Sequence, residues 1–164
     1  MFKPKQQHKE RELIPEGTHE GYCYGLVDCG THDRKPFQGK AKSPAQYICL
    51  FFEFTELRKV FKEENGEEPC VKSTQMPFFF GENSNFTKLM KPWIGDPEKF
   101  ELTNIVGMPV SITIAHEAGQ DGTVYDNIIG LAPMSPKLIP LMPKMHNKPM
   151  VFSIEGHGFE SKEY

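Results

Sequence analysis

Hydrophobic and polar side chains alternate along five stretches of the chain, with the period of two that is typical of β-strands. The expected strands cover residues 18–29, 46–57, 70–76, 109–117 and 122–132. A sharp bend is expected in the first strand, where Gly21 and Gly25 have no side chains. The pattern therefore predicts a mainly β protein.

A short helix is expected between the third and fourth strands. Apolar residues between positions 86 and 90 recur at helical spacing, Asn83 or Ser84 can cap the start, and Pro92 is expected to end the helix. Most of the run Phe78-Phe79-Phe80 before the helix is expected to pack in the core against it. Trp93 after the helix is expected to cap the bottom of the fold, with base stacking as the alternative.

Turn residues separate the predicted elements. Residues 63–68 and 119–122 each contain a glycine within a polar run, which predicts a hairpin at both places. Residues 30–44 combine Gly, Pro and Ser with almost no apolar period, so we expect a long loop there. Five prolines in residues 133–149 argue against regular structure, so this segment should drape over the body or remain mobile. The residues after it are a candidate edge strand.

The order of these elements is that of the five-stranded OB-fold barrel, with its helix between strands 3 and 4 and here a Pro-rich C-terminal extension. Residues 1–14 are expected to be a flexible, slightly basic N-terminal segment, residues 15–132 the OB-fold domain, and residues 133–164 a Pro/Met-rich extension with a mildly acidic tail. OB-folds bind oligonucleotides or oligosaccharides on the face of strands 2 and 3, next to the loop after strand 1.

Length and composition fit one soluble domain. The chain has 164 residues, of which 38% are hydrophobic, and a net charge of −3, so any site for anions must be local. The longest apolar stretch, residues 47–52, is too short to span a membrane, and no signal-peptide segment precedes it. We therefore expect a cytosolic protein with no membrane partner.

Motifs for catalysis or metal binding are not found in the sequence. The four cysteines form no CxxC pair, the six histidines show no ligand spacing, and no nucleotide-binding or nucleophile motif occurs. Asp28 and His32 are a weak candidate pair for a metal, with a surface pair as the default. We expect no enzyme activity, no cofactor, no metal, and buried cysteine thiols.

The loop at residues 30–44 contains residue types that are suited to binding single-stranded nucleic acid. Its four cations and one carboxylate give a charge of +3, and an aromatic ring lies among them. Phosphates need such cations, and bases stack on such rings. The candidates are Arg34, Lys35, Phe37, Lys40 and Lys42. The alternative is a solvated loop with a stray phenylalanine.

Further candidates lie on the strands. Tyr47 and Phe51 should point away from the core on the second strand, where they either present a stacking platform or are covered by the Pro-rich segment. Lys72 on the third strand either adds a cation or is only a solvated charge. Tyr22 on the first strand and Tyr125 on the fifth complete the candidate set.

Several segments resemble a family. PEGTHEGYCYGLVDCGTH at residues 15–32 is similar to the PEGTY…GIVDLGTQ start of small phage-encoded single-stranded-DNA-binding proteins. FFEFTE, SNFTKLMKPWIG, NIVGMPVSITIAH and VYDNIIGLAPM resemble the later strands and the helix of that family, in the same order. These segments lie at residues 51–56, 84–95, 104–116 and 124–134.

The resemblance implies a non-catalytic OB-fold protein that coats single-stranded DNA in phage replication or recombination, in the cytoplasm of the host cell. As a further hypothesis, the acidic, aromatic C-terminal tail recruits replication or recombination proteins. A homo-oligomer is left open. The rival reading is an OB-like protein-interaction module that docks a replication or host protein through its Phe- and Met-rich surface.

Overall fold

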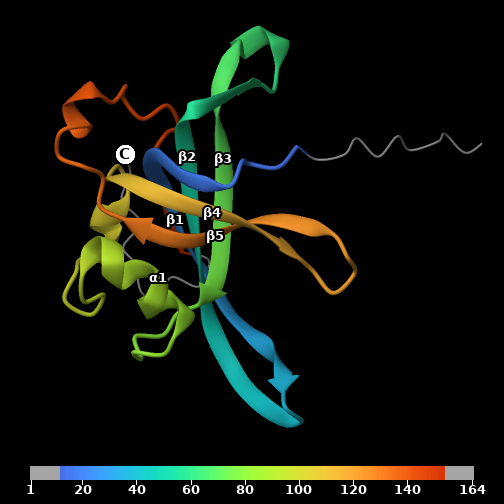
Figure 1. Cartoon of the computed structure of the whole chain (residues 1–164). Coiled ribbons are helices and arrows are strands. Elements are labelled where there is room, and N and C mark those ends of the chain that lie inside the picture. Colours follow the sequence, from blue (N-terminus) through green and yellow to red (C-terminus); the bar gives the residue numbers. More distant parts are fainter. Residues whose placement is uncertain (1–11, 154–164) are drawn as a thin grey trace, which may run out of the picture.

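The computed structural model describes residues 12–153. It consists of strands and short helical segments in the order shown in Figure 1. The strands are β1 (Gly17–Phe37), β2 (Lys40–Val60), β3 (Glu67–Pro77), β4 (Pro109–Ala118), β5 (Val124–Ala132) and β6 (Met150–Ser153). The α-helix is α1 (Asn85–Ile94), and the 3-10 turns are η1 (Glu63–Asn65), η2 (Leu102–Ile105) and η3 (Ile139–Leu141).

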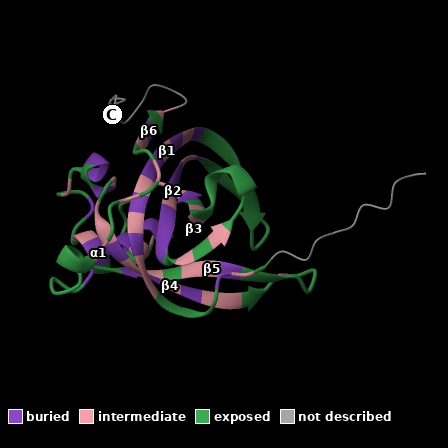
Figure 2. Ribbon diagram, turned by 90° about the horizontal axis from the view of Figure 1, so that it is seen from above, coloured by how far each residue is buried: buried purple, intermediate pink, exposed green. Residues whose placement is uncertain are grey.

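The strands form one curled sheet with the order β3-β2-β1-β4-β5, in which all of these neighbours are antiparallel. β6 adds a short parallel pairing to β1, from Gly25 opposite Met150 to Asp28 opposite Ser153. Figure 2 shows buried stretches of β1, β2 and β4 around the inside of the curl. The five expected strands, the helix between the third and fourth, and the short edge strand are confirmed. The curled sheet is consistent with an OB-like barrel.

The expectation of a loop at residues 30–44 is wrong. β1 and β2 continue through this region as a two-stranded arm that turns at Gln38 and Gly39. Both turn residues have positive φ, 51° and 74°, as a two-residue hairpin turn of type I′ requires. Most of the arm is exposed, so no core imposes an apolar alternation on its sequence. The hydrophobic pattern therefore gave no sign of these strand ends.

The expected end of the helix at Pro92 is also wrong, because α1 continues to Ile94 and ends at Gly95, whose φ is 78°. Proline lacks the amide that would donate to the Lys88 carbonyl. Lys88 and Pro92 are both exposed, so water can hydrate that carbonyl. At the other end, Ser84 is the cap, and its Oγ accepts a hydrogen bond from Thr87 N at 3.1 Å.

The core lies between the inner face of the sheet and α1. Phe52 and Phe54 of β2 are fully buried, as the parity of that strand predicts, and α1 contributes Phe86, Met90 and Trp93. The Trp93 ring lies 6.2 Å from that of Phe52 and is buried, so Trp93 packs in the core and is not exposed for base stacking. Within residues 12–153, no helix is long and apolar enough to cross a membrane.

Gly21 lies where β1 pairs with two strands at once, opposite Phe54 of β2 and Val110 of β4. A Cβ atom on Gly21 would lie 1.9 Å from the carbonyl oxygen of Glu53, which belongs to the backbone and cannot rotate away. The close approach of β1 and β2 at the bend therefore requires glycine here.

Gly21→Ala should lower the free energy of unfolding by about 3 kcal/mol, at the upper end of typical overpacking costs. Urea unfolding followed by circular dichroism measures this loss. Gly81→Ala is the matched control, because a Cβ on Gly81 meets no atom within 4 Å. An equal effect of the two substitutions would contradict the steric argument.

Candidate nucleic-acid interface

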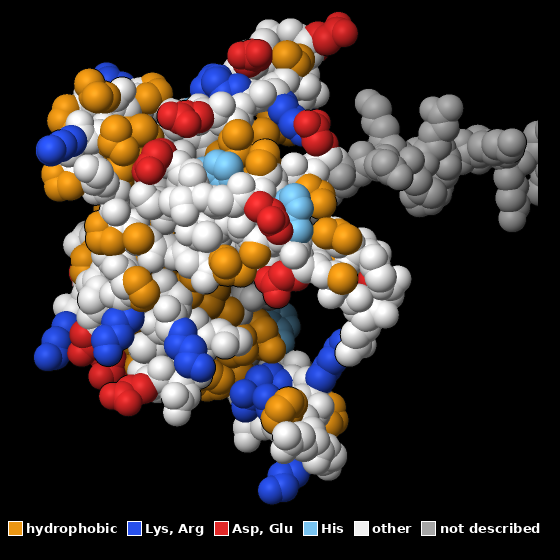
Figure 3. All heavy atoms as spheres, in the orientation of Figure 1, with side chains coloured by type: hydrophobic (Ala, Val, Ile, Leu, Met, Phe, Trp, Pro, Cys, Tyr) orange, Lys and Arg blue, Asp and Glu red, His pale blue; other side chains and the backbone are white. Residues whose placement is uncertain are grey.

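The two-stranded arm of β1 and β2, residues 31–43, extends from the body at the lower end of Figure 1 and is called the basic arm below. It carries four cations and one carboxylate, a charge of +3, in a protein whose net charge is −3. Figure 3 shows Lys and Arg side chains on this arm together with hydrophobic atoms. The fold thus concentrates positive charge in one projecting element.

Cations and aromatic rings are paired within the basic arm. Phe37 lies next to the turn with 60% of its surface exposed, and Lys42 Nζ is 4.8 Å from the centre of its ring. The Arg34 side chain donates from Nε to the Ser43 carbonyl at 2.6 Å, and its guanidinium lies 5.2 Å from the centre of the Phe79 ring. Such geometry lets one surface meet both phosphates and bases.

The remaining lysines of the basic arm, Lys35 and Lys40, are exposed. The structure therefore brings all five loop candidates onto one arm, and it adds Phe79, which was not among the candidates. Phe79 and Phe80 are 41% and 43% exposed, and only Phe78 of the three packs against the core, so the expectation that most of this run packs in the core is wrong. Three consecutive residues of extended chain cannot all point inward.

Ser84 also explains the position of Phe79. The Ser84 Oγ that caps α1 donates a hydrogen bond to the Phe79 carbonyl at 2.7 Å. The helix cap therefore holds the segment after β3 beside the basic arm. An N-cap serine five residues after an aromatic run is the sequence signal that was available for this placement.

The outer face of the sheet, which points away from the core, carries Tyr47 and Phe51 of β2. Both are half-buried. The Tyr47 ring makes an edge contact with His32 at 5.8 Å, and the Phe51 ring lies 5.9 Å from that of Tyr24. Tyr47 therefore borders the base of the basic arm, since β1 carries His32 into that arm.

Two thiols lie between these aromatic residues. Cys29 and Cys49 are hydrogen-bonded to each other across β1 and β2. Burial raises the pKa of Cys49 to about 11, with a further rise from Cys29, while a hydrogen bond with Ser73 lowers it in part. Burial and the neighbouring Asp28 likewise raise the pKa of Cys29. Both thiols are therefore neutral near pH 7.

All four cysteines are free thiols. Cys23, Cys49 and Cys70 are buried, as expected, and Cys29 is half-buried. Burial raises the pKa of Cys23 to about 12. Among residues 12–153, no group of three or more His, Cys, Asp or Glu side chains is placed to hold a metal ion.

The Pro-rich segment covers one end of the outer face. The Glu53 carboxylate, on a side chain that is only 1% exposed, accepts hydrogen bonds from the backbone amides of His146 and Asn147, both at 2.9 Å. The Asn147 side-chain amide donates a third, at 3.2 Å. Tyr22 donates its hydroxyl proton to the Pro143 carbonyl at 2.7 Å. Residues 143–147 are thus held over Glu53 and Tyr22. Together with β6 they are called the covering segment below.

The covering segment limits the exposure of two candidates, Tyr22 and Phe51. Burial, and then the charge of Glu53, raise the pKa of Tyr22, and its hydroxyl is engaged by the covering segment. A Cβ on Gly25 would lie 2.9 Å from the Met150 side chain and 3.1 Å from that of Phe51, so both side chains pack over this glycine. The covering segment therefore reaches Phe51 from one side.

Lys72 lies elsewhere. Its Nζ is 2.9 Å from the Asp126 carboxylate, and the lysine side chain is only 16% exposed. Asp126 is fully buried and also accepts the backbone amide of Ile14 at 2.8 Å. Lys72 thus links β3 to β5 and is not an open phosphate contact. Tyr125 is 41% exposed on β5 and packs beside Gly119 in the β4–β5 turn.

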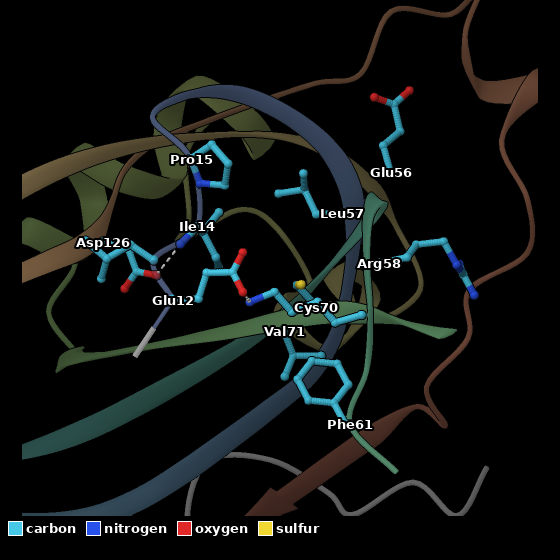
Figure 4. A pocket seen from close by; sticks show the side chains of 12 residues that line it. Glu12, Ile14, Pro15, Glu56, Leu57, Arg58, Phe61, Cys70, Val71 and Asp126 are labelled. Carbon is cyan, nitrogen blue, oxygen red and sulfur yellow. Dashed lines mark hydrogen bonds and ion pairs between the residues drawn. The ribbon is translucent and has the colours of Figure 1, made fainter. Parts of the chain in front are cut away.

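A cavity of about 470 Å³ lies at the other end of β2. Figure 4 shows the cavity between residues 12–15, the end of β2 and the start of β3. The Ile14 amide is hydrogen-bonded to the Asp126 carboxylate beside it. Lys59 and Glu12 form an ion pair at its wall, 2.5 Å apart. None of the candidate residues for nucleic-acid binding lines this cavity.

Comparison of the chain with protein-family models, with curated proteins and with solved structures finds no match. The resemblance of the sequence segments to phage single-stranded-DNA-binding proteins therefore stays a prediction.

Glu53→Gln should release the covering segment, because the amide group presents one acceptor oxygen and two donors to three N–H groups. We expect faster hydrogen exchange of the His146 and Asn147 amides and a loss of about 2 kcal/mol in stability, the scale of hydrogen bonds to charged groups. Hydrogen-exchange mass spectrometry and urea unfolding measure both effects. The control is Glu56→Gln, an exposed position on the same strand. Unchanged exchange at residues 146 and 147 would show that Glu53 does not hold this segment.

Proposed function

We propose that this protein is an OB-type barrel that binds single-stranded DNA with little sequence preference. The observation that carries the proposal is the basic arm. It gathers Arg34, Lys35, Lys40 and Lys42 around an exposed Phe37, although the whole protein is acidic. Unspecific single-strand binders combine a positive track for the phosphates with aromatic faces for the bases.

The architecture supports the same proposal. The sheet order β3-β2-β1-β4-β5, with α1 between β3 and β4, is the arrangement expected of an OB-fold. The basic arm is the connection between the first two strands, which borders the ligand face in OB-folds. Tyr47 lies at the junction of arm and outer face, so a strand of DNA can pass from Phe37 and Phe79 onto Tyr47.

In this arrangement the arm cations neutralise phosphates, and Phe37 and Phe79 stack bases. Lys72 and Tyr22 are left out of the interface, because Asp126 and Pro143 already engage their polar groups. Phe51 is reached from the side that Met150 does not cover. The resemblance to phage-encoded proteins supports a place in phage DNA replication or recombination, with no catalytic step.

An interaction module for another protein is the rival function. One observation favours it, namely that Leu138, Ile139 and Leu141 of the Pro-rich segment are exposed, Leu141 by 78%. The salt dependence of the binding affinity distinguishes the two functions. Release of counterions makes phosphate binding strongly salt-dependent, whereas an apolar interface lacks that dependence.

Fluorescence anisotropy with a labelled oligo-dT of about 30 nucleotides tests the proposal. The free single strand should bind, with affinity that falls as salt rises, and the duplex of equal length should bind far more weakly. Phe37→Ala should weaken binding by about 5-fold to 150-fold, the value of one base stack, without changing the salt slope.

The triple variant Lys35→Ala, Lys40→Ala, Lys42→Ala should reduce the salt slope by about 2, since each phosphate contact on single strands contributes about 0.7. Lys91→Ala, on the exposed side of α1, is the control and should leave both affinity and slope unchanged. Absence of binding at low salt would overturn the proposed function and favour the interaction module.

A further inference from the structure

β2 connects two arms of opposite charge. Its first residues belong to the basic arm, and its last residues lead into the hairpin with η1 and β3 at the opposite end of the molecule (Figure 1). We call residues 60–68 the acidic arm. Glu63, Glu64, Glu67 and Glu68 against Lys62 give it a charge of −3, which equals the +3 of the basic arm in magnitude.

Both arms carry exposed apolar side chains. Val60 and Phe61 of the acidic arm are each 56% exposed, and Phe37 of the basic arm is 60% exposed. Figure 3 shows acidic side chains together with some Lys and Arg at the upper arm and mainly basic ones at the lower arm, with hydrophobic atoms in both places. Exposed apolar groups rimmed by charge are typical of interaction sites.

The two arms cannot meet within one chain, because the 21-residue strand β2 separates them. They are complementary between chains, in charge and in the apolar residue that each presents. We propose that the acidic arm of one copy docks on the basic arm of the next, so that the protein associates head to tail.

In this contact Phe61 packs against Phe37, while Glu63, Glu64 and Glu67 face the cations of the basic arm. The two surfaces are different, so the interface is heterologous and leaves one unused arm at each end of a pair. Further copies add at those ends. The proposal concerns the protein without nucleic acid and does not rest on the proposed function.

Analytical ultracentrifugation of the full chain tests the association. At about 10 mM salt, where the Debye length is about 30 Å, the weight-average mass should rise above 18.7 kDa as the protein concentration increases. At about 1 M salt, where the Debye length is about 3 Å, the mass should return to 18.7 kDa. A single-chain mass at every concentration and at low salt would overturn the proposal.

Charge exchange identifies the surfaces. The variant Glu63→Lys, Glu64→Lys, Glu67→Lys has two basic arms, and the variant Lys35→Glu, Lys40→Glu, Lys42→Glu has two acidic arms. Each alone should sediment as a single chain, and an equimolar mixture should associate again. The matched control, Lys88→Glu with Lys91→Glu on α1, should associate like the wild type. Association of either arm variant alone, or none in the mixture, would overturn the assignment.

Oligo-dT binding separates this inference from the proposed function. The variant with two basic arms keeps every residue of the nucleic-acid interface, so it should bind oligo-dT at least as tightly as the wild type while failing to associate. Association without oligo-dT binding supports the contact between copies and refutes only the proposed function. Circular dichroism of each variant establishes that it folds.

Discussion

The buried carboxylate of Asp126 is the interaction on which the shape of the protein depends. A charge removed from water is stable only when it is paired and fully hydrogen-bonded. Asp126 meets this need with Lys72 of β3 and with the backbone amide of Ile14, so it joins the two outermost strands of the sheet and the segment before β1. This link holds the sheet in its curl, and the curl separates a packed inner face from an outer face that the Pro-rich segment covers at one end.

The curl also sets how charge is distributed. β1 and β2 are longer than the core they cover, and their outer ends continue as a hairpin that no apolar layer supports. The basic arm therefore carries charged and turn residues together with the exposed Phe37, and the acidic arm that follows β2 has the opposite net charge. If both proposals hold, nucleic acid and the acidic arm of a second copy compete for one surface, and binding of a DNA strand releases the acidic arm of a neighbour.

The sequence predicted the elements that pack against the core and failed where they leave it. Alternation located the five strands, and the parity of Ile48, Leu50, Phe52 and Phe54 was right because their burial imposes the pattern. The basic arm has no such constraint, so its strands appeared as a loop. Local sequence gave the cations and Phe37 of the candidate site, but not Phe79, whose position depends on the helix cap at Ser84. Lys72 was misjudged because its partner lies 54 residues away.

Glu53 shows most clearly what local reasoning lacks. Its parity on β2 places it outward, where a glutamate is normally solvated, yet it is buried because residues 146 and 147 supply three N–H donors. The covering segment has almost no regular structure, so these bonds, the Tyr22 hydroxyl and the short β6 ladder hold it. It is therefore a part of the fold rather than an appendage. The strength of the hydrogen bonds from the His146 and Asn147 amides to the Glu53 carboxylate therefore determines how much of the aromatic outer face is exposed.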